Sequence, residues 1–376
     1  MQRRLVFIDN VRWAAISMVV VMHAAVTYSP FGSWYFREHP RLDLPALVAF
    51  GTYQSFQHAV AMGLLFGIAG CFAGAAVDRK GPAGFLRERA VRLGLPLLAY
   101  TLAIGPLTEY YVAQSWRTRE GFAAAWLRHL ASGELASGSG PLWFCLVLLG
   151  FSLGYAGLRT LRRRPPPNRT WPVPGPIAVA GVAVVMAAAT FTVGIVAPHG
   201  GTVLNVDIHD FPQYPLMFAA GVLAWRHDWL PRLAARAGGL WLGTGLLTTG
   251  ALWAALILGG GALTGELSAY GGGWHWQAAG MDLWRSVTCL TLSVGILALA
   301  RDHCDRQGPV ARFLTRNAFG VYVVHAPILV VITRALHDWP VGVAAKFLFA
   351  SAAGIAASFL FVGFVMQRTP GLRALV

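Results

Sequence analysis

Charged side chains are scarce in this chain of 376 residues, making up only 12% of it. Acidic residues number 16, and of the 30 basic residues only two, Lys80 and Lys346, are lysines. Hydrophobic residues make up 56% of the chain. This composition excludes an ordinary soluble globular domain, which carries about twice this share of charge.

Cysteine is scarce as well, with four residues in the whole chain. Cys71, Cys145 and Cys289 fall in apolar runs, and Cys304 falls in a basic loop. Neither the paired spacing of a zinc site nor the framework of a disulfide-rich domain is present. We therefore predict no metal site and interpret the four cysteines as inert side chains.

Long apolar runs of about 17 to 25 residues recur along the whole chain, which is the length that crosses a bilayer. The first run lacks the short apolar core and small-residue cleavage site of a signal peptide, so we interpret it as a retained span. We predict an all-α integral membrane protein, a bundle of about ten transmembrane helices forming one domain over residues 1–376. The predicted spans are 11–29, 53–77, 93–112, 141–159, 176–198, 211–225, 240–262, 281–300, 317–336 and 342–366.

The net charge of +14 is distributed as in a membrane protein, and this argues against a nucleic-acid partner. With ten spans, 22 of the 30 basic residues fall on the side that holds the N-terminus and 7 on the other, while Lys346 lies in the last span. Basic loops face the cytoplasm in such proteins. The asymmetry therefore predicts that both termini are cytoplasmic.

The first span, DNVRWAAISMVVVMH, contains two polar residues that share one helix face. Arg12 and His23 are eleven residues apart, which is three helical turns plus about 20°. The rise places His23 about 16 Å deeper than Arg12, or about half the thickness of the hydrocarbon core. Ionisable groups at such depth are unfavourable and indicate a functional site. The alternative is a boundary arginine and a histidine whose hydrogen bonds a neighbouring helix satisfies.

A second histidine, His325 in YVVHAP, is expected at the same depth as His23. Both spans run outward from the cytoplasm, and both histidines lie about 13 to 18 Å above the cytoplasmic ends. Two imidazoles facing each other in apolar surroundings lower each other's basicity, so at least one stays neutral and can accept a proton. The alternative is that His325 bonds a backbone carbonyl freed by Pro327.

On the predicted cytoplasmic side, FLRERAVRLGLPLL places Arg89 and Arg92 three residues apart on one helix face. With Arg12 they are suited to phosphate groups, which guanidinium binds in a bidentate manner. The alternative is topological anchoring by basic residues. Near the outer side, Glu109 and Asp282 are candidate partners for Arg285, and solvation at the interface is an equally good alternative.

Five separated motifs follow one another along the chain: RLVFIDNVRWAAISMVVVMH, HAVAMGLLFGIAGCFAGAAVDRKGPAGFLRERAVRLGLPLL, GPLWFCLVLLGFSL, FGVYVVHAPILV and QRTPGLRALV. In this order they resemble the acyltransferase-3 family of membrane O-acyltransferases. The chain is most like the branch of the glucan biosynthesis protein C succinyltransferases. One departure is AMGLLFGIAG, in which Ala69 stands where that branch tends to have a serine.

The resemblance implies about ten helices in the bacterial inner membrane, and transfer of an acetyl or succinyl group from cytoplasmic acyl-CoA to a hydroxyl of a glycan or another envelope or secreted acceptor. By motif match, His23 is the catalytic imidazole, Arg12 helps to hold it or the donor, and His325 lies in a late aromatic-histidine motif. Arg89 and Arg92 lie in the matching basic motif. Assigning the CoA phosphates to Arg12, Arg89 and Arg92 is our inference from charge and topology.

Two other functions remain open from the sequence. A proton-coupled secondary transporter or exporter of an anionic or glycan substrate would use the same histidines as a proton relay. The absence of an internal repeat and of carboxylates in mid-span disfavours it. A non-catalytic membrane scaffold or sensor predicts instead that His23 tolerates substitution.

Overall fold

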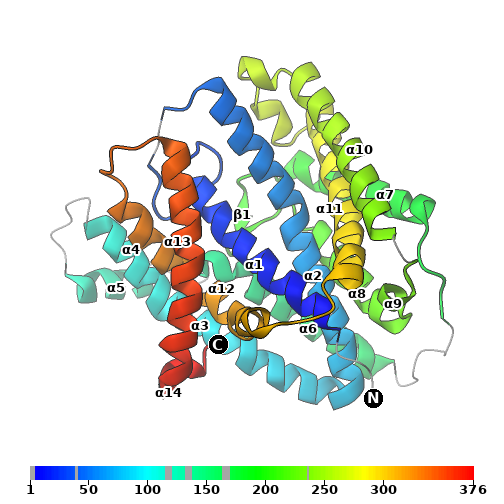
Figure 1. Ribbon diagram of the computed structural model, residues 1–376, viewed down its shortest axis with the longest axis horizontal. Coiled ribbons are helices and arrows are strands. Elements are labelled where there is room, and N and C mark those ends of the chain that lie inside the picture. Colours follow the sequence, from blue (N-terminus) through cyan, green and yellow to red (C-terminus); the bar gives the residue numbers. More distant parts are fainter. Residues whose placement is uncertain (1–4, 39–40, 115–120, 132–137, 163–169, 235–236) are drawn as a thin grey trace. The chain divides into compact units, whose positions relative to one another are not determined.

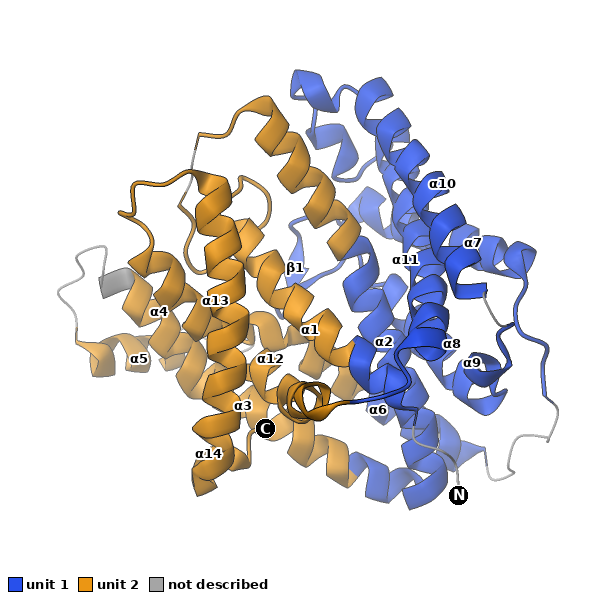
Figure 2. Ribbon diagram, in the orientation of Figure 1, with its two compact units in different colours: residues 1–11, 58–86, 151–307 blue, residues 12–57, 87–150, 308–376 orange. Residues whose placement is uncertain are grey.

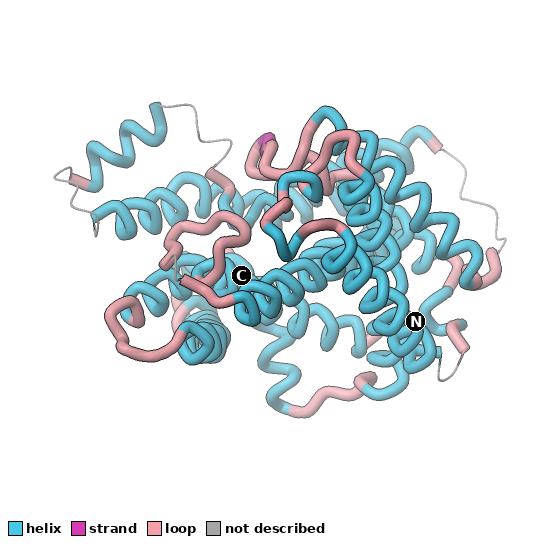
Figure 3. Tube along the Cα trace, turned by 90° about the horizontal axis from the view of Figure 1, so that it is seen from above, coloured by secondary structure: helices cyan, strands magenta, loops and turns pink. Residues whose placement is uncertain are grey.

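The computed structural model describes residues 5–38, 41–114, 121–131, 138–162, 170–234 and 237–376. Helices form nearly all of the regular structure (Figures 1 and 3), and the strands within the described residues are β1 (Thr202–Val203) and β2 (Val206–Asp207). The prediction of an all-α fold is confirmed apart from this short antiparallel hairpin. Its two turn residues, Leu204 and Asn205, have φ angles of 55° and 64°, as a tight two-residue hairpin turn requires.

Fourteen α-helices follow one another along the described part of the chain (Figure 1). They are α1 (Val6–Thr27), α2 (Leu44–Arg89), α3 (Leu95–Ala99), α4 (Gly105–Gln114), α5 (Phe122–Ala131), α6 (Trp143–Leu161), α7 (Pro176–Val196), α8 (Gln213–Arg226), α9 (Trp229–Arg232), α10 (Ala237–Gly259), α11 (Trp276–His303), α12 (Pro309–Ala335), α13 (Val343–Phe364) and α14 (Pro370–Arg373).

Within the described ranges, eight helical stretches are long and apolar enough to cross a membrane. The predicted spans 53–77 and 93–112 both lie in one of these, Leu44–Val112, and the predicted span 211–225 corresponds to the 14-residue α8, which is too short to be counted. The count of ten and the cytoplasmic termini therefore stay predictions. Some of the arginines behind that orientation lie outside the described residues, namely Arg3, Arg4, Arg117, Arg119, Arg163, Arg164, Arg169 and Arg236.

The stretch Leu44–Val112 is interrupted where its sequence disfavours a regular α-helix. α2 bends at Gly81, whose φ of 72° is outside the helical region, and Pro82 follows directly. Two π-helical segments, η1 (Ala90–Gly94) and η2 (Tyr100–Ile104), flank α3. Because Pro96 in α3 has no amide proton, the regular hydrogen-bond ladder cannot pass through it, and wider turns take its place.

The chain divides into two compact units (Figure 2), each assembled from segments that are distant in sequence. Unit 1 comprises residues 1–11, 58–86 and 151–307, and unit 2 comprises residues 12–57, 87–150 and 308–376. Helices α1, α2 and α6 contribute to both units. One domain over residues 1–376 stays a prediction.

Unit 1 packs its helices through small residues, which let two backbones approach closely. Gly221 on α8 lies against the backbone of Gly67 on α2, and Gly238 on α10 lies against the backbone of Leu299 on α11. A methyl group added at Gly221 or at Gly238 would collide with main-chain atoms of the facing helix, which cannot rotate away as a side chain can. These crossings therefore fix the spacing of the helices that carry the polar groups of unit 1.

Unit 2 packs α1, α12 and α13 around an apolar contact that positions its two histidines. Val20 on α1 and Leu329 on α12 are both fully buried, and both side chains lie beside Gly354 on α13. His23 follows Val20 by three residues, and His325 precedes Leu329 by four. Side chains three or four residues apart share a helix face, so this contact directs both imidazoles to the interior of unit 2.

We predict that Gly238→Ala destabilises the protein by about 1–3 kcal/mol, because the new methyl group overpacks the crossing with α11. Gly239→Ala is the matched control, since Gly239 is exposed and its added methyl group would meet open space. We expect it to be neutral or slightly stabilising, because alanine favours a helix more than glycine does. Thermal unfolding in detergent measures both, and equal effects of the two substitutions would refute the close crossing.

Candidate functional site

The imidazoles of His23 and His325 stack in unit 2. Their ring centroids are 5.3 Å apart and their planes differ by 19°. The structure thus brings together the two histidines that their predicted depths had placed at one level. Helix α1 is continuous from Val6 to Thr27, so Arg12 and His23 also keep the helical spacing that the sequence indicated.

A third ring, that of Trp34, completes the stack, and the sequence analysis missed it. The indole lies on His23 with centroids 3.8 Å apart and planes 14° apart, and its centroid is 6.2 Å from that of His325. Trp34 belongs to the loop that follows α1. The run of three aromatic residues at 34–36, directly after the span that carries His23, is the signal that could have indicated it.

The two imidazoles differ in accessibility and in hydrogen bonding. His325 is fully buried, and its Nδ1 donates to the carbonyl oxygen of Tyr322 at 2.8 Å. Since a carbonyl only accepts, the proton of the neutral ring is on Nδ1, and Nε2 is a bare acceptor. His23 is partly accessible, and within the described residues its buried Nδ1 has no hydrogen-bond partner. His23 is therefore the imidazole that a substrate can reach.

The hydrogen bonds of the two histidines bear on the alternative interpretations, in which neighbouring groups merely satisfy them. His325 does bond a backbone carbonyl of the preceding turn, but that of Tyr322, whereas Pro327 frees the carbonyl of Val323, four residues before it. For His23, no neighbouring helix satisfies Nδ1 in the part of the chain that the structure describes. A structural hydrogen bond therefore accounts for the buried His325 but not for His23.

Hydrogen bonds hold the first and the last residue of the segment 30–38, which carries Trp34. Arg37 donates from Nη2 to the carbonyl of Pro30 at 2.9 Å. Lys346, buried on α13, donates from Nζ to Glu38 Oε1 and to the carbonyl oxygen of His337, both at 2.6 Å. The lysine predicted inside the last span is thus compensated by a carboxylate from this loop, and the loop is anchored in turn.

Tyrosine hydroxyls next to Trp34 link the loop to the π-helical segment η2. Tyr35 is edge-on to Trp34, and its hydroxyl lies 2.9 Å from that of Tyr100. Burial raises the pKa of Tyr35 to about 12, despite the opposing hydrogen bond to Tyr100. Tyr35 is therefore a neutral phenol at physiological pH and adds no charge beside the imidazoles.

The predicted phosphate-binding arginines have different surroundings. Arg12 is half-buried on α1, Arg89 is half-buried at the end of α2, and Arg92 is exposed in η1. Arg89 lies within electrostatic range of Arg92. Because the turn of η1 is wider than that of an α-helix, the side chains of Arg89 and Arg92 point in more different directions than the predicted shared helix face implies. Convergence of Arg12 with either arginine stays a prediction.

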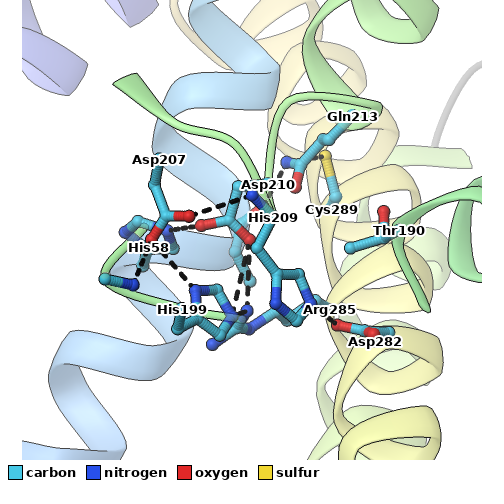
Figure 4. A network of polar contacts seen from close by, with 12 residues as sticks. His58, Thr190, His199, Asp207, His209, Asp210, Gln213, Asp282, Arg285 and Cys289 are labelled. Carbon is cyan, nitrogen blue, oxygen red and sulfur yellow. Dashed lines mark hydrogen bonds and ion pairs between the residues drawn. The ribbon is translucent and has the colours of Figure 1, made fainter. Parts of the chain in front are cut away.

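Unit 1 contains a second polar cluster, around Arg285 on α11 (Figure 4). Arg285 Nη1 lies 3.1 Å from Asp210 Oδ1 and also contacts His199 Nε2. His58 on α2 lies with Nε2 2.6 Å from the other oxygen of Asp210. The candidate pairing of Arg285 with Glu109 or Asp282 is wrong: the loop before α8 folds back and supplies Asp210, which the separation along the sequence concealed.

Three further contacts extend this cluster (Figure 4). His199 Nδ1 lies 3.1 Å from Asp207 Oδ2, and the His199 ring stacks on that of His209 at 3.8 Å between centroids. His209 Nε2 lies 3.0 Å from Asp282 Oδ1, and both of these side chains are buried. The acidic loop 199–210 is thereby tied to α11 by alternating charges and imidazoles.

The charges of the cluster shift the pKa values of its loop residues. Burial alone would raise the pKa of Asp210, but Arg285 and His58 hold it well below its usual range. Burial lowers the pKa of His199, and the guanidinium of Arg285 lowers it further, against the hydrogen bond to Asp207. At neutral pH the cluster therefore pairs an ionised Asp210 with Arg285 beside a neutral His199.

The donor atoms of this cluster come close enough for a metal ion, but their directions do not converge. Ligand atoms of His199, His209 and Asp282, and of His199, Asp207 and Asp210, lie within 4.8 Å of one another. Imidazole lone pairs lie in the ring plane, however, and the stacked rings of His199 and His209 are only 7° from parallel. Arg285 also contacts His199 Nε2. This geometry favours a charge-compensated anchor for the loop.

We predict that acidification loosens this loop through His199. Because the pKa of His199 is lower in the fold than its unfolded value of about 6.5, its stabilising contribution is complete above that pH and declines as the pH falls below it, by at most about 1.4 kcal/mol per pH unit. His199→Gln should therefore lose less melting temperature between pH 7.5 and 5.5 than the unsubstituted protein does.

The control for this experiment is His303→Gln, at an exposed residue at the end of α11. It should show the pH dependence of the unsubstituted protein. An unchanged pH dependence in His199→Gln would contradict a His199 that is kept neutral by burial and by Arg285.

Comparison with known proteins relates nearly the whole chain to one family. The family model Acyl_transf_3, described as an acyltransferase domain, matches residues 5–363. A search of curated proteins and a search of solved structures gave no match. The matched range contains the ring stack of unit 2, the three arginines and the cluster of unit 1.

Proposed function

The chain belongs to the acyltransferase-3 family, and we propose that it moves a small acyl group from acyl-CoA to a hydroxyl of a glycan or another envelope acceptor. The family match and the apolar helices make it a multi-pass membrane acyltransferase. The donor, the acceptor and the location in a bacterial inner membrane are part of the proposal. The resemblance to glucan biosynthesis protein C favours a succinyl group, with acetyl as the alternative.

One observation carries the proposal: His23 is a partly accessible imidazole, with no hydrogen-bond partner in the described chain, inside an apolar helix bundle. Such a group is unfavourable to keep in this environment unless it performs a function. Imidazole is also the side chain best suited to accept a proton near neutral pH. An acyl transfer to a hydroxyl requires one base of this kind.

In the simpler course of the reaction, His23 acts as a general base. It takes the proton of the acceptor hydroxyl while that oxygen attacks the thioester carbonyl carbon. The carbon–sulfur bond then breaks, and the CoA thiolate leaves with the proton that His23 held. In the alternative course, the His23 nitrogen attacks the thioester first, releases CoA, and passes the acyl group to the hydroxyl in a second step.

His325 supports either course without touching the substrate. It is fully buried, and its Nδ1 is committed to the carbonyl of Tyr322. Two protonated rings 5.3 Å apart in apolar surroundings would repel each other strongly, so His325 remains neutral while His23 carries the proton. We assign it a positioning role beside the catalytic His23.

The donor is proposed to dock through its phosphates at the predicted cytoplasmic side. Arg12, Arg89 and Arg92 are the candidate partners, since guanidinium matches phosphate oxygens. Keeping the phosphates at the surface avoids moving their charges into lipid, while the neutral thioester end of the thin pantetheine arm can enter the bundle. Arg12 on the helix of His23 supports this arrangement, because three helical turns separate surface and interior by about 16 Å.

Substitution of His23 tests the proposal directly. We expect His23→Ala to reduce the release of free CoA thiol from acetyl-CoA or succinyl-CoA in the presence of acceptor glycan by at least about 100-fold, the scale of general-base catalysis. His303→Ala, at an exposed residue, should retain full activity. The assay uses purified protein in lipid nanodiscs and a thiol reagent.

The same assay separates the competing functions. If the unsubstituted protein releases no CoA but moves a glycan or an anion across liposomes with a proton, it is a transporter. If CoA release is normal in His23→Ala, His23 is not the base, and this mechanism is contradicted.

Substitution of Arg12 tests the docking of the donor. We expect Arg12→Lys to raise the KM for acyl-CoA by about 10-fold and to leave the KM for the acceptor unchanged, since lysine binds phosphate as a point charge without the bidentate fork. Arg79→Lys, at an exposed arginine of α2, is the control and should change neither constant. An unchanged KM for acyl-CoA in Arg12→Lys would contradict its role in binding the phosphates.

A further inference from the structure

We propose that Trp34 is the positioning residue for His23: its indole face orients the imidazole and stabilises the positive charge that the ring acquires during acyl transfer. The inference rests on the proposed function and extends it to a residue outside the motifs from which that function was derived. It concerns contacts within unit 2 only.

His23 has no carboxylate hydrogen-bonded to its Nδ1 in the described part of the chain. A histidine base is commonly oriented by a carboxylate that accepts a hydrogen bond from Nδ1 and stabilises the imidazolium. Here the Nδ1 of His23 is buried and has no hydrogen-bond partner among the residues that the structure describes. The ring is therefore held by contacts to its faces, and the proton it accepts must be stabilised by something other than a paired anion.

The indole of Trp34 lies face to face with the imidazole of His23. The centroids of Trp34 and His23 are 3.8 Å apart and the planes differ by only 14°, so the imidazole lies flat on the indole face. A cation within about 6 Å of a tryptophan centroid is attracted by the negative face of the ring, and tryptophan is the best of the aromatic residues for this interaction. The attraction exists only when His23 is protonated.

Because the attraction depends on the charge of His23, the contact stabilises the transition state more than the ground state. When the acceptor O–H bond breaks, the N–H bond forms on His23, and the imidazole becomes a cation while the oxygen attacks the thioester. An interaction that strengthens as this charge develops lowers the barrier without tightening the binding of the substrates. The expected signature is a change in kcat with little change in KM.

The loop that carries Trp34 is anchored to the neighbouring helices. Glu38, four residues further on, receives the buried Lys346, and its backbone N–H donates to the carbonyl of Thr27 at the end of α1 at 2.9 Å. Arg334 lies over the ring of Phe36, with its guanidinium carbon 4.9 Å from the centroid. These contacts tie the loop to α1, α12 and α13, so the indole is preorganised against His23.

The test replaces Trp34 by tryptophans with one, two and three fluorine atoms on the ring, introduced at this codon alone. Fluorine withdraws electron density from the indole face while keeping its shape, so stacking remains and the attraction for a cation weakens step by step. We expect kcat for acyl transfer to fall progressively with each fluorine, to about one tenth in the trifluorinated protein, with the KM for acyl-CoA within twofold.

Trp339 provides the matched control, since it lies in the same unit, is exposed, and is edge-on to Phe349 at 5.5 Å. The same fluorinated series at this position should leave kcat unchanged. As a second variant, Trp34→Leu keeps an apolar contact without a π face, and we expect it to lower kcat by about 10- to 30-fold.

Each outcome decides a different statement. A kcat that is flat across the fluorinated series at Trp34, or a series that changes only KM, overturns the proposal for Trp34 while leaving His23 as the base. Absence of acyl transfer in the unsubstituted protein overturns the proposed function itself. A progressive fall in kcat at Trp34 with none at Trp339 supports the charge-stabilising role.

Discussion

An ionisable ring inside an apolar helix bundle has to be compensated, and this constraint determines the site of unit 2. Burying a polar group without a partner is unfavourable by several kcal/mol in hydrocarbon-like surroundings. His325 meets the constraint with a hydrogen bond to the Tyr322 carbonyl, whereas His23 lies on the face of Trp34 and its buried Nδ1 has no hydrogen-bond partner in the described part of the chain. Within that part, Nδ1 of His23 therefore has no hydrogen bond that competes with proton transfer, which supports the proposal that His23 rather than His325 acts as the base.

The two units compensate buried charge in different ways. In unit 1, Arg285 is paired with Asp210, and imidazoles share the remaining carboxylates, so opposite charges lie next to each other and tie the loop to α11. Among the described residues, the buried Arg285 Nε, His209 Nδ1 and Asp282 Oδ2 of this cluster have no hydrogen-bond partner. In unit 2, Lys346 meets Glu38 in the loop, and the rings beside His23 carry no fixed charge. Paired charges anchor the loop in unit 1, whereas in unit 2 an imidazole without a charged partner is suited to accepting a proton.

The sequence indicated the elements of the fold better than the partners of its polar residues. The helix of Arg12 and His23 and the meeting of His23 with His325 followed from helical spacing, because both depend on regular rise per residue. The partners of Arg285 and Lys346, and the presence of Trp34, did not follow. Each of these contacts comes from a loop, and the path of an irregular loop is set by tertiary contacts that carry no period in the sequence.

The central claim is that the reactive end of an acyl-CoA donor reaches His23 in the interior of unit 2. Bromoacetyl-CoA tests it most directly, since it places an alkylating carbon next to the thioester position and marks the nucleophile that lies there. The account predicts that His23 displaces bromide and carries the acetyl-CoA thioester on its imidazole, or a carboxymethyl group once that thioester is hydrolysed and CoA is released. Peptide mass spectrometry locates the adduct, and excess acetyl-CoA or succinyl-CoA should prevent it. An adduct confined to other residues, or one that these donors do not prevent, would contradict it.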